Sequence, residues 1–297
     1  MNKLLRVLVI CSIGVAFAAS PIAWAQTYTT VDYPGAIGTT LNGGPNPQGT
    51  SVGSYSSDGF ASTSHGFTLT SKGVFTPFDP PGSVFTTPNS ISPQGVIAGD
   101  YLDSGKVSHG FVLNGTKYTS VDAPGAAGTS LTGINPSGEI SGFTCSDPAC
   151  GIFGAPNTTH SFVISKKGDY TFFDPPGAIS STASTVNPSG AVVGAYTDSG
   201  GVGHGYLRDK NGTFTTIDFP GSASTFAGYI NAEGHIVGEY TDTAGVGHSF
   251  LLSNGTFTSF DPPGAVFSDA SGINPSGVIV GIFFDSAGNA HGYIRTS

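Results

Sequence analysis

The chain has 297 residues, a net charge of −9, and charged side chains at only 10% of its positions, against about 25% in an ordinary soluble domain. Ten lysines and arginines against 19 acidic residues argue against nucleic acid and anionic membrane surfaces as partners, because both are bound through clustered basic side chains.

The N-terminal residues predict an export signal. Lys3 and Arg6 form a short basic region, residues 8–19 are almost wholly apolar, and residues 23–25 (Ala-Trp-Ala) form the small-x-small pattern of a signal-peptidase site. The alternative is a membrane anchor, but the apolar core is shorter than the roughly 20 residues that a spanning helix needs. We therefore expect a signal peptide over residues 1–25, a secreted or periplasmic protein, a bacterial source, and a mature chain with net charge −11.

The mature chain is a six-fold repeat. The motif Asp-x-Pro-Gly recurs at intervals of 43 to 52 residues, and a histidine that precedes an aromatic residue recurs at intervals of 43 to 51. The motif aspartates are Asp32, Asp79, Asp122, Asp174, Asp218 and Asp261, and the histidines are His65, His109, His160, His204, His248 and His291. Periods of this length indicate a repeat architecture.

Each unit carries four strand signals. The first strand is rich in aromatic residues and threonine and ends at Asp-x-Pro-Gly; the second ends in Ile-Asn and leads through an Asn-Pro-Ser-Gly turn into the third, which has a central glycine. The fourth begins at the histidine, and Asn-Gly then joins it to the next first strand in a predicted hairpin. Strands two, three, four and the following first strand should form one antiparallel meander.

The phase of the repeat predicts how the fold closes. The mature chain starts with a spare first-type strand at 28–32 and ends with a fourth-type strand at 291–295. Pairing these two strands would complete the sixth meander and remove two open edges. We therefore expect an all-β, single-domain protein over residues 26–297: a six-bladed β-propeller of four-stranded antiparallel blades. A right-handed β-helix is the alternative, but its repeats are shorter and need no hairpin turns.

The repeats resemble the extracellular repeats of the HAF family, named for a His-Ala-Phe core. Here the triplet reads His-Gly-Phe, His-Ser-Phe or His-Gly-Tyr, and the likeness covers nearly the whole mature chain. The resemblance implies export and a repeat fold, and it brings no catalytic residues with it.

Two cysteines remain in the mature chain, Cys145 and Cys150, within an insertion at 145–157 in the third repeat. In an oxidising compartment so close a pair is expected to form a disulfide. A metal site is the alternative, with His160 as a further ligand.

The repeated aspartates and histidines are expected to be structural. Each Asp-x-Pro-Gly aspartate should cap its own turn, although a ring of carboxylates around a metal or a sugar is conceivable. A second set of aspartates lies six residues before a repeat histidine in four of the units: Asp103, Asp198, Asp242 and Asp285. Each could act with its histidine as a catalytic base and its orienting partner, or could form a hydrogen bond that ties the hairpin loop to the fourth strand. An active site needs only one such pair, whereas a scaffold needs one in each blade, so we expect the structural role.

Function is best sought where one copy departs from the others. The fifth repeat places Glu233, His235 and Glu239 close together in sequence, and His235 and Glu239 share a strand face. They form our candidate ligand site, with an exposed polar strand edge as the alternative explanation.

No catalytic, metal or cofactor motif stands above the repeat background. We expect a monomeric, non-enzymatic scaffold that binds an unknown extracellular ligand, glycan or protein. The alternatives are a carbohydrate-active lyase or hydrolase and a purely structural cell-surface protein. An insertion folded over the channel would favour an enzyme, and one projecting from the rim would not.

Overall fold

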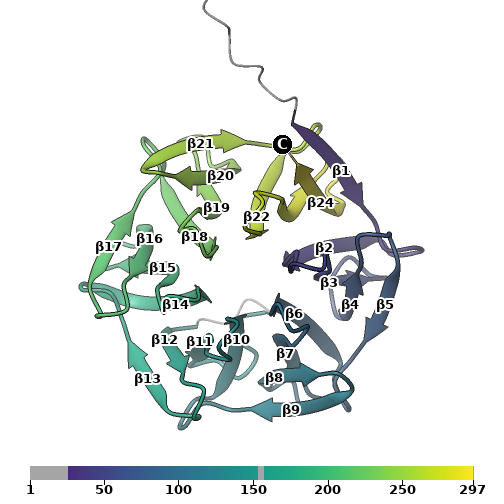
Figure 1. Ribbon diagram of the computed structural model, residues 1–297, viewed down its shortest axis with the longest axis horizontal. Coiled ribbons are helices and arrows are strands. Elements are labelled where there is room, and N and C mark those ends of the chain that lie inside the picture. Colours follow the sequence, from purple (N-terminus) through teal and green to yellow (C-terminus); the bar gives the residue numbers. More distant parts are fainter. Residues whose placement is uncertain (1–25, 153–156, 297) are drawn as a thin grey trace, which may run out of the picture.

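A computed structural model describes residues 26–152 and 157–296; the predicted signal peptide, residues 1–25, lies outside them. Figure 1 shows six four-stranded sheets arranged as blades around a central channel. The predicted six-bladed propeller is therefore confirmed. Among the described residues, no helix has the length and apolar character needed to cross a membrane.

The first three blades follow the chain from the channel outward. Blade 1 contains β2 (Gly38–Gly43), β3 (Ser51–Ser56), β4 (His65–Leu69) and β5 (Phe75–Phe78). Blade 2 contains β6 (Phe85–Ile91), β7 (Ile97–Leu102), β8 (Ser108–Asn114) and β9 (Lys117–Val121). Blade 3 contains β10 (Gly128–Ile134), β11 (Ile140–Cys145), β12 (Thr159–Ile164) and β13 (Tyr170–Phe173).

The last three blades continue in the same order. Blade 4 contains β14 (Ala178–Val186), β15 (Val192–Asp198), β16 (Gly203–Arg208) and β17 (Phe214–Ile217). Blade 5 contains β18 (Ser224–Ile230), β19 (Ile236–Thr241), β20 (Gly247–Ser253) and β21 (Thr256–Phe260). Blade 6 contains β22 (Phe267–Ile273), β23 (Ile279–Phe284), β24 (Ala290–Thr296) and, on its outer edge, β1 (Thr27–Val31).

Strand β1 closes the ring as predicted. It pairs antiparallel with β24, with Thr27 opposite Thr296 and Val31 opposite Gly292, so both strands differ by only a residue or so from the expected bounds. Figure 1 shows β1 beside β24, at the point where the purple start and the yellow end of the chain meet. Val31 is buried with Leu41 and Phe67 of blade 1, so the closing strand also packs against the neighbouring blade.

The Asn-Pro-Ser-Gly turns gather on one face of the ring, which we call the lower face. In the turn at 135–138, the amide N–H of Gly138 donates to the carbonyl of Asn135 at 3.0 Å, and Gly138 has a φ of +84°, which glycine adopts without strain. The buried Asn135 side chain also donates from Nδ2 to the carbonyl of Asn187 in the next blade, at 3.1 Å. Asn187 and Asn231 repeat this bond to their own next blades. The turn asparagines therefore link consecutive blades.

The core lies between the blades and is built from the aromatic residue of each histidine triplet. These side chains are at most 1% exposed: Phe67, Phe111, Phe162, Tyr206, Phe250 and Tyr293. The central glycine of the third repeat strand makes room for this ring, as expected, because a Cβ atom on Gly142 would lie 2.6 Å from the ring of Phe162.

Candidate functional site

Each repeat histidine is hydrogen-bonded through Nδ1 to the carboxylate of the Asp-x-Pro-Gly aspartate at the end of the adjacent outer strand, which accepts the bond. The Nδ1 to carboxylate distances are 2.7 to 3.0 Å, for the pairs His65–Asp79, His109–Asp122, His160–Asp174, His204–Asp218, His248–Asp261 and His291–Asp32. The expectation that these aspartates cap their own turns needs correction. The turn closes through its backbone instead, as where the N–H of Ala36 donates to the carbonyl of Tyr33 at 3.1 Å.

The second aspartate set lies on the other side of the same histidine rings. Asp103, Asp198, Asp242 and Asp285 each have a carboxylate oxygen 3.5 Å from Nε2 of the following repeat histidine. Each also accepts backbone N–H bonds in its own hairpin loop, as Asp242 does from Ala244 and Val246. Burial lowers the pKa of His248, but the bonds and charges of Asp261 and Asp242 outweigh it and leave that pKa raised. Because the same aspartate–histidine contact occurs in four blades, it is best explained as a structural link between the hairpin loop and the strand that carries the histidine.

The structure does not bring Glu239 together with Glu233 and His235. Glu233 is exposed in the turn on the lower face, and His235 follows it just before β19 begins. Glu239 lies four residues further along the strand, about 13 Å away at about 3.3 Å per residue. Glu239 lines a hollow on the opposite face, which we call the upper face. Of the three predicted residues, Glu239 alone lines this hollow.

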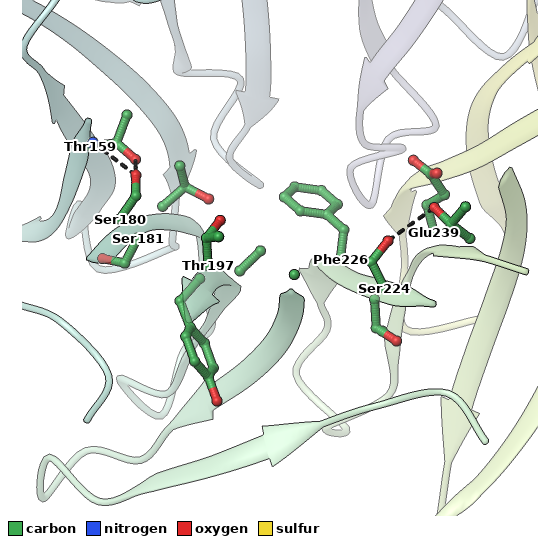
Figure 2. A pocket seen from close by; sticks show the side chains of 13 residues that line it. Thr159, Ser180, Ser181, Thr197, Ser224, Phe226 and Glu239 are labelled. Carbon is green, nitrogen blue, oxygen red and sulfur yellow. Dashed lines mark hydrogen bonds between the residues drawn. The ribbon is translucent and has the colours of Figure 1, made fainter. Parts of the chain in front are cut away.

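That hollow, which we call the upper groove, has a volume of about 270 Å³ and crosses the upper end of blade 4 toward blade 5. Figure 2 shows its lining from β12 on one side to β18 and β19 on the other. Hydroxyl side chains predominate: Thr159, Ser180, Ser181, Thr182, Thr197, Ser224, Thr225 and Thr241. Several are held by one another, as where Ser224 Oγ donates to Thr241 Oγ1 at 3.0 Å. The groove therefore offers many hydrogen-bonding groups in fixed positions.

The groove is open because two blades lack the group that fills the equivalent space elsewhere. At the upper end of the inner strand, blades 2 and 6 carry Phe85 and Phe267. Blade 1 carries Gly38, where a Cβ atom would lie 2.7 Å from the ring of Phe60. Blades 4 and 5 carry serines, Ser180 and Ser224, and are hollow.

In blade 3 the predicted disulfide fills this space. Cys145 and Cys150 are bonded, with 2.04 Å between the sulfur atoms, as expected. A Cβ atom on Gly128 would lie 2.9 Å from Sγ of Cys150, and the carbonyl of Pro148 accepts from the N–H of Ser108 in blade 2 at 2.7 Å. The described part of the insertion therefore packs on the seam between blades 2 and 3.

Phe226 stands where the upper groove meets the central channel. It lies on the inner strand β18, is 37% exposed, and lines both the groove and a channel cavity of about 230 Å³. Figure 2 shows its ring projecting between the labelled serine and threonine side chains. The equivalent residues of blades 1 to 4 are small and polar: Thr40, Thr87, Ser130 and Thr182. The exposed ring is therefore a departure from the repeat.

Two carboxyl groups with raised pKa values lie beside Phe226, Glu239 on the groove side and Asp269 on the channel side. Burial, and then the charge of Asp269, raise the pKa of Glu239 to about 7. Burial raises the pKa of Asp269 to about 6, and among the described residues no group hydrogen-bonds to its buried Oδ1 atom. A half-buried pair of this kind holds a proton near neutral pH, because two adjacent carboxylates repel each other.

The seam between blades 2 and 3 is the one other place where an acid follows the central glycine of the third strand; blades 1, 3, 4 and 6 carry Ser54, Phe143, Ala195 and Ile282 there. Asp100 is the equivalent of Glu239, and Ser130 is the equivalent of Asp269. There the carboxylate is satisfied, because Ser130 Oγ and Asn89 Nδ2 both donate to Asp100 Oδ1 at 2.8 Å. Blade 6 replaces the donor with a second acid, so the Glu239–Asp269 pair lacks that internal bond.

Phe226, Glu239 and Asp269 therefore form one polar and aromatic group where the upper groove meets the channel: Glu239 lines the groove, Asp269 lines the channel cavity, and Phe226 lines both. Sequence reasoning missed Phe226 and Asp269, although comparing the third position of each inner strand would have found both. Among the described residues, no three histidine, cysteine or acidic side chains are grouped as a metal site would require.

Neither a protein-family model nor a curated protein sequence matches the chain. Solved propellers match in fold. A putative TolB from Agrobacterium tumefaciens has a TM-score of 0.57 and 14% identity over 86% of this chain and 89% of that one. TolB from Acinetobacter baumannii has a TM-score of 0.53 and 14% identity; the match covers 79% of this chain but only 60% of that one.

A fungal lectin from Aleuria aurantia, described as a six-bladed β-propeller, has a TM-score of 0.53 and 14% identity over 86% of this chain and 91% of that one. The same lectin has been solved with α-methyl-L-fucoside. At these identities the likeness concerns the fold.

Proposed function

We propose that the protein is exported as a single propeller domain and binds a glycan in the upper groove. The carrying observation is the exposed ring of Phe226, which departs from the repeat inside an otherwise hydroxyl-lined hollow and has Glu239 on its groove side and Asp269 on its channel side. An exposed aromatic ring suits the apolar face of a sugar, while fixed hydroxyl and carboxyl groups suit its hydroxyls. The lectins with this fold bind fucosides, which supports the choice of ligand class.

Export is part of the same proposal. The disulfide suits an oxidising compartment, and the predicted signal peptide and the resemblance to HAF repeats point the same way. We further propose that the protein acts as a monomer.

A carbohydrate-active enzyme is the second candidate, and the Glu239–Asp269 pair favours it. A carboxyl group that stays protonated near neutral pH is a suitable general acid, and a neighbouring carboxylate is a suitable base or nucleophile. Both groups come from adjacent blades and meet beside the channel.

The test is a glycan array with the secreted protein and its Phe226→Thr variant, which installs the residue that blades 1 and 2 already use. We expect a defined set of glycans to bind the wild type and the variant to bind them about fivefold more weakly, since a stacked ring contributes about 1 kcal/mol. Phe172→Thr, at an exposed ring on β13, is the matched control and should bind normally.

Cleavage of the bound glycans separates the two candidates. Release of new chain ends by the wild type but not by Glu239→Gln would establish the enzyme. Binding without release, retained in Glu239→Gln at reduced affinity, would establish the scaffold. Equal binding by Phe226→Thr and the wild type would exclude the upper groove.

A further inference from the structure

A second hollow, which we call the lower groove, lies between blades 3 and 4 on the face of the Asn-Pro-Ser-Gly turns. Its volume is about 440 Å³, within the range of small-molecule sites. Its lining includes Thr171 of blade 3, Ser189 of the blade 4 turn, and the cations Arg208 and Lys210 at the end of β16. The groove at the same place between blades 6 and 1 has no cation among the described residues that line it and carries Leu69 and Ser71 at the positions of Arg208 and Lys210.

Arg208 is held in place but lacks an acceptor. Its guanidinium lies over the ring of Phe173 in blade 3, with 4.5 Å between Cζ and the ring centroid. Its Nε is buried, and among the described residues no acceptor bonds to it. A buried donor without a partner costs about 1 to 3 kcal/mol, so such a group calls for an explanation.

The repeat supplies an internal comparison. Arg295 occupies the same position in blade 6 and lies over Phe260 in the same way, at 4.3 Å. Its Nε donates to Oε1 of Gln26 at 3.1 Å, and the side chain is only 6% exposed. The same stacked arginine is therefore satisfied in blade 6 by a side-chain carbonyl and left unsatisfied in blade 4. The other four blades carry leucine or isoleucine at this position: Leu69, Leu113, Ile164 and Leu252.

The charges around Arg208 favour a negatively charged acceptor. Lys210 adds a second cation to the groove wall. Glu139 also lines the groove, so the two cations outnumber the one lining acid, and Glu139 Oε2 already accepts from Asn135 Nδ2 at 2.7 Å. Asp209 lies outside the lining, and its Oδ1 accepts two backbone N–H bonds of its own hairpin at 2.8 Å. The planar guanidinium presents its N–H donors in a fixed fork, which matches the two oxygens of a planar carboxylate better than an ammonium group does.

We propose that the lower groove binds the carboxylate of a small ligand, of the size and kind of a uronic acid, with Arg208 and Lys210 as its cationic contacts. The carboxylate takes the place at Arg208 that the Gln26 carbonyl takes at Arg295. This site lies on the opposite face from the upper groove and shares no lining residue with it, so the two proposals can be tested independently of each other.

The test is a calorimetric and NMR titration of the wild-type protein with D-glucuronate, with D-glucose as the neutral control and inorganic sulfate as an oxyanion of different shape. Arg208→Leu installs the residue of blades 1, 2 and 5 and should fold normally. We expect it to bind glucuronate at least tenfold more weakly. Lys210→Ser, on an exposed hairpin, should lose a few-fold. Arg295→Leu removes the satisfied arginine and should bind as the wild type does, although its thermal midpoint should fall.

Glucuronate binding by the wild type, lost in Arg208→Leu and kept in Arg295→Leu, would support the site. No binding of glucuronate, equal binding of glucose, or unchanged binding by both Arg208→Leu and Lys210→Ser would overturn it. Sulfate binding as tightly as glucuronate would overturn the assignment to a carboxylate.

Discussion

Replacing Glu239 by glutamine should stabilise the protein, and only at neutral and alkaline pH. The side chain is half-buried beside Asp269, and its pKa rises from 4.5 to about 7 on folding. Glutamine keeps the shape of the protonated acid and cannot ionise. The variant therefore lacks the cost that the wild type incurs when the carboxyl loses its proton inside the fold.

The size of the effect follows from the pKa change. Because the folded pKa is the higher one, the wild type has its full stability below pH 4.5 and loses stability as the pH rises to about 7. One pKa unit corresponds to about 1.36 kcal/mol, so the loss reaches at most about 3 kcal/mol. The pKa of Asp269, about 6, should also fall in the variant because the opposing charge is gone.

Urea unfolding at pH 4, 6 and 8 measures this difference. We expect the free energies of unfolding of wild type and Glu239→Gln to agree within about 0.5 kcal/mol at pH 4 and to differ by 2 to 3 kcal/mol, roughly, at pH 8. Glu233→Gln, at an exposed turn position, is the control and should show no such widening. A difference that is the same at every pH would refute the reasoning.

Three further predictions concern the scaffold. The double variant Cys145→Ser, Cys150→Ser should lose about 2 kcal/mol in urea unfolding, as expected for so short a loop, and an unchanged midpoint would contradict this. Val31→Ala should lower the free energy of unfolding by about 2 kcal/mol, and the exposed Thr29→Ala should lower it by less than about 0.5 kcal/mol; equal effects would mean that β1 is not packed against blade 1. Gly194→Ala should lower the free energy of unfolding by about 3 kcal/mol, because its Cβ would collide with the backbone carbonyl of Thr182 and lie 2.8 Å from the ring of Tyr206; a thermal midpoint equal to that of the wild type would disprove the close approach.

The fold could be predicted because its information is local and repeated. The Asn-Gly hairpins, the Asn-Pro-Ser-Gly turns and the central glycines each fix a neighbouring pair of strands. The closing pair could be inferred by counting strands, since 28–32 and 291–295 were each left without a partner in their own unit. The observed pairing begins one residue earlier, at Thr27.

The errors arose where side chains meet across strands. Five of the six motif aspartates bind histidines 13 or 14 residues away, and Asp32 binds His291 across the ring closure; only the register of the two outer strands brings each pair together. Glu239 was predicted, but grouping it with His235 considered the strand face and neglected the distance along the strand. The upper groove itself could not be predicted, because its extent depends on loops that place Phe60 and Cys150 against the inner strands of blades 1 and 3.

The pairing of β1 with β24 has a consequence for the order of events when the chain is made. Strand β1 is synthesised long before its partner β24, which lies more than 250 residues later in the chain. Five blades can assemble from neighbouring segments during that time, while the edge of β1 is free to join another molecule. A propeller closed in this way therefore has to keep one short strand unpaired until β24 has been made.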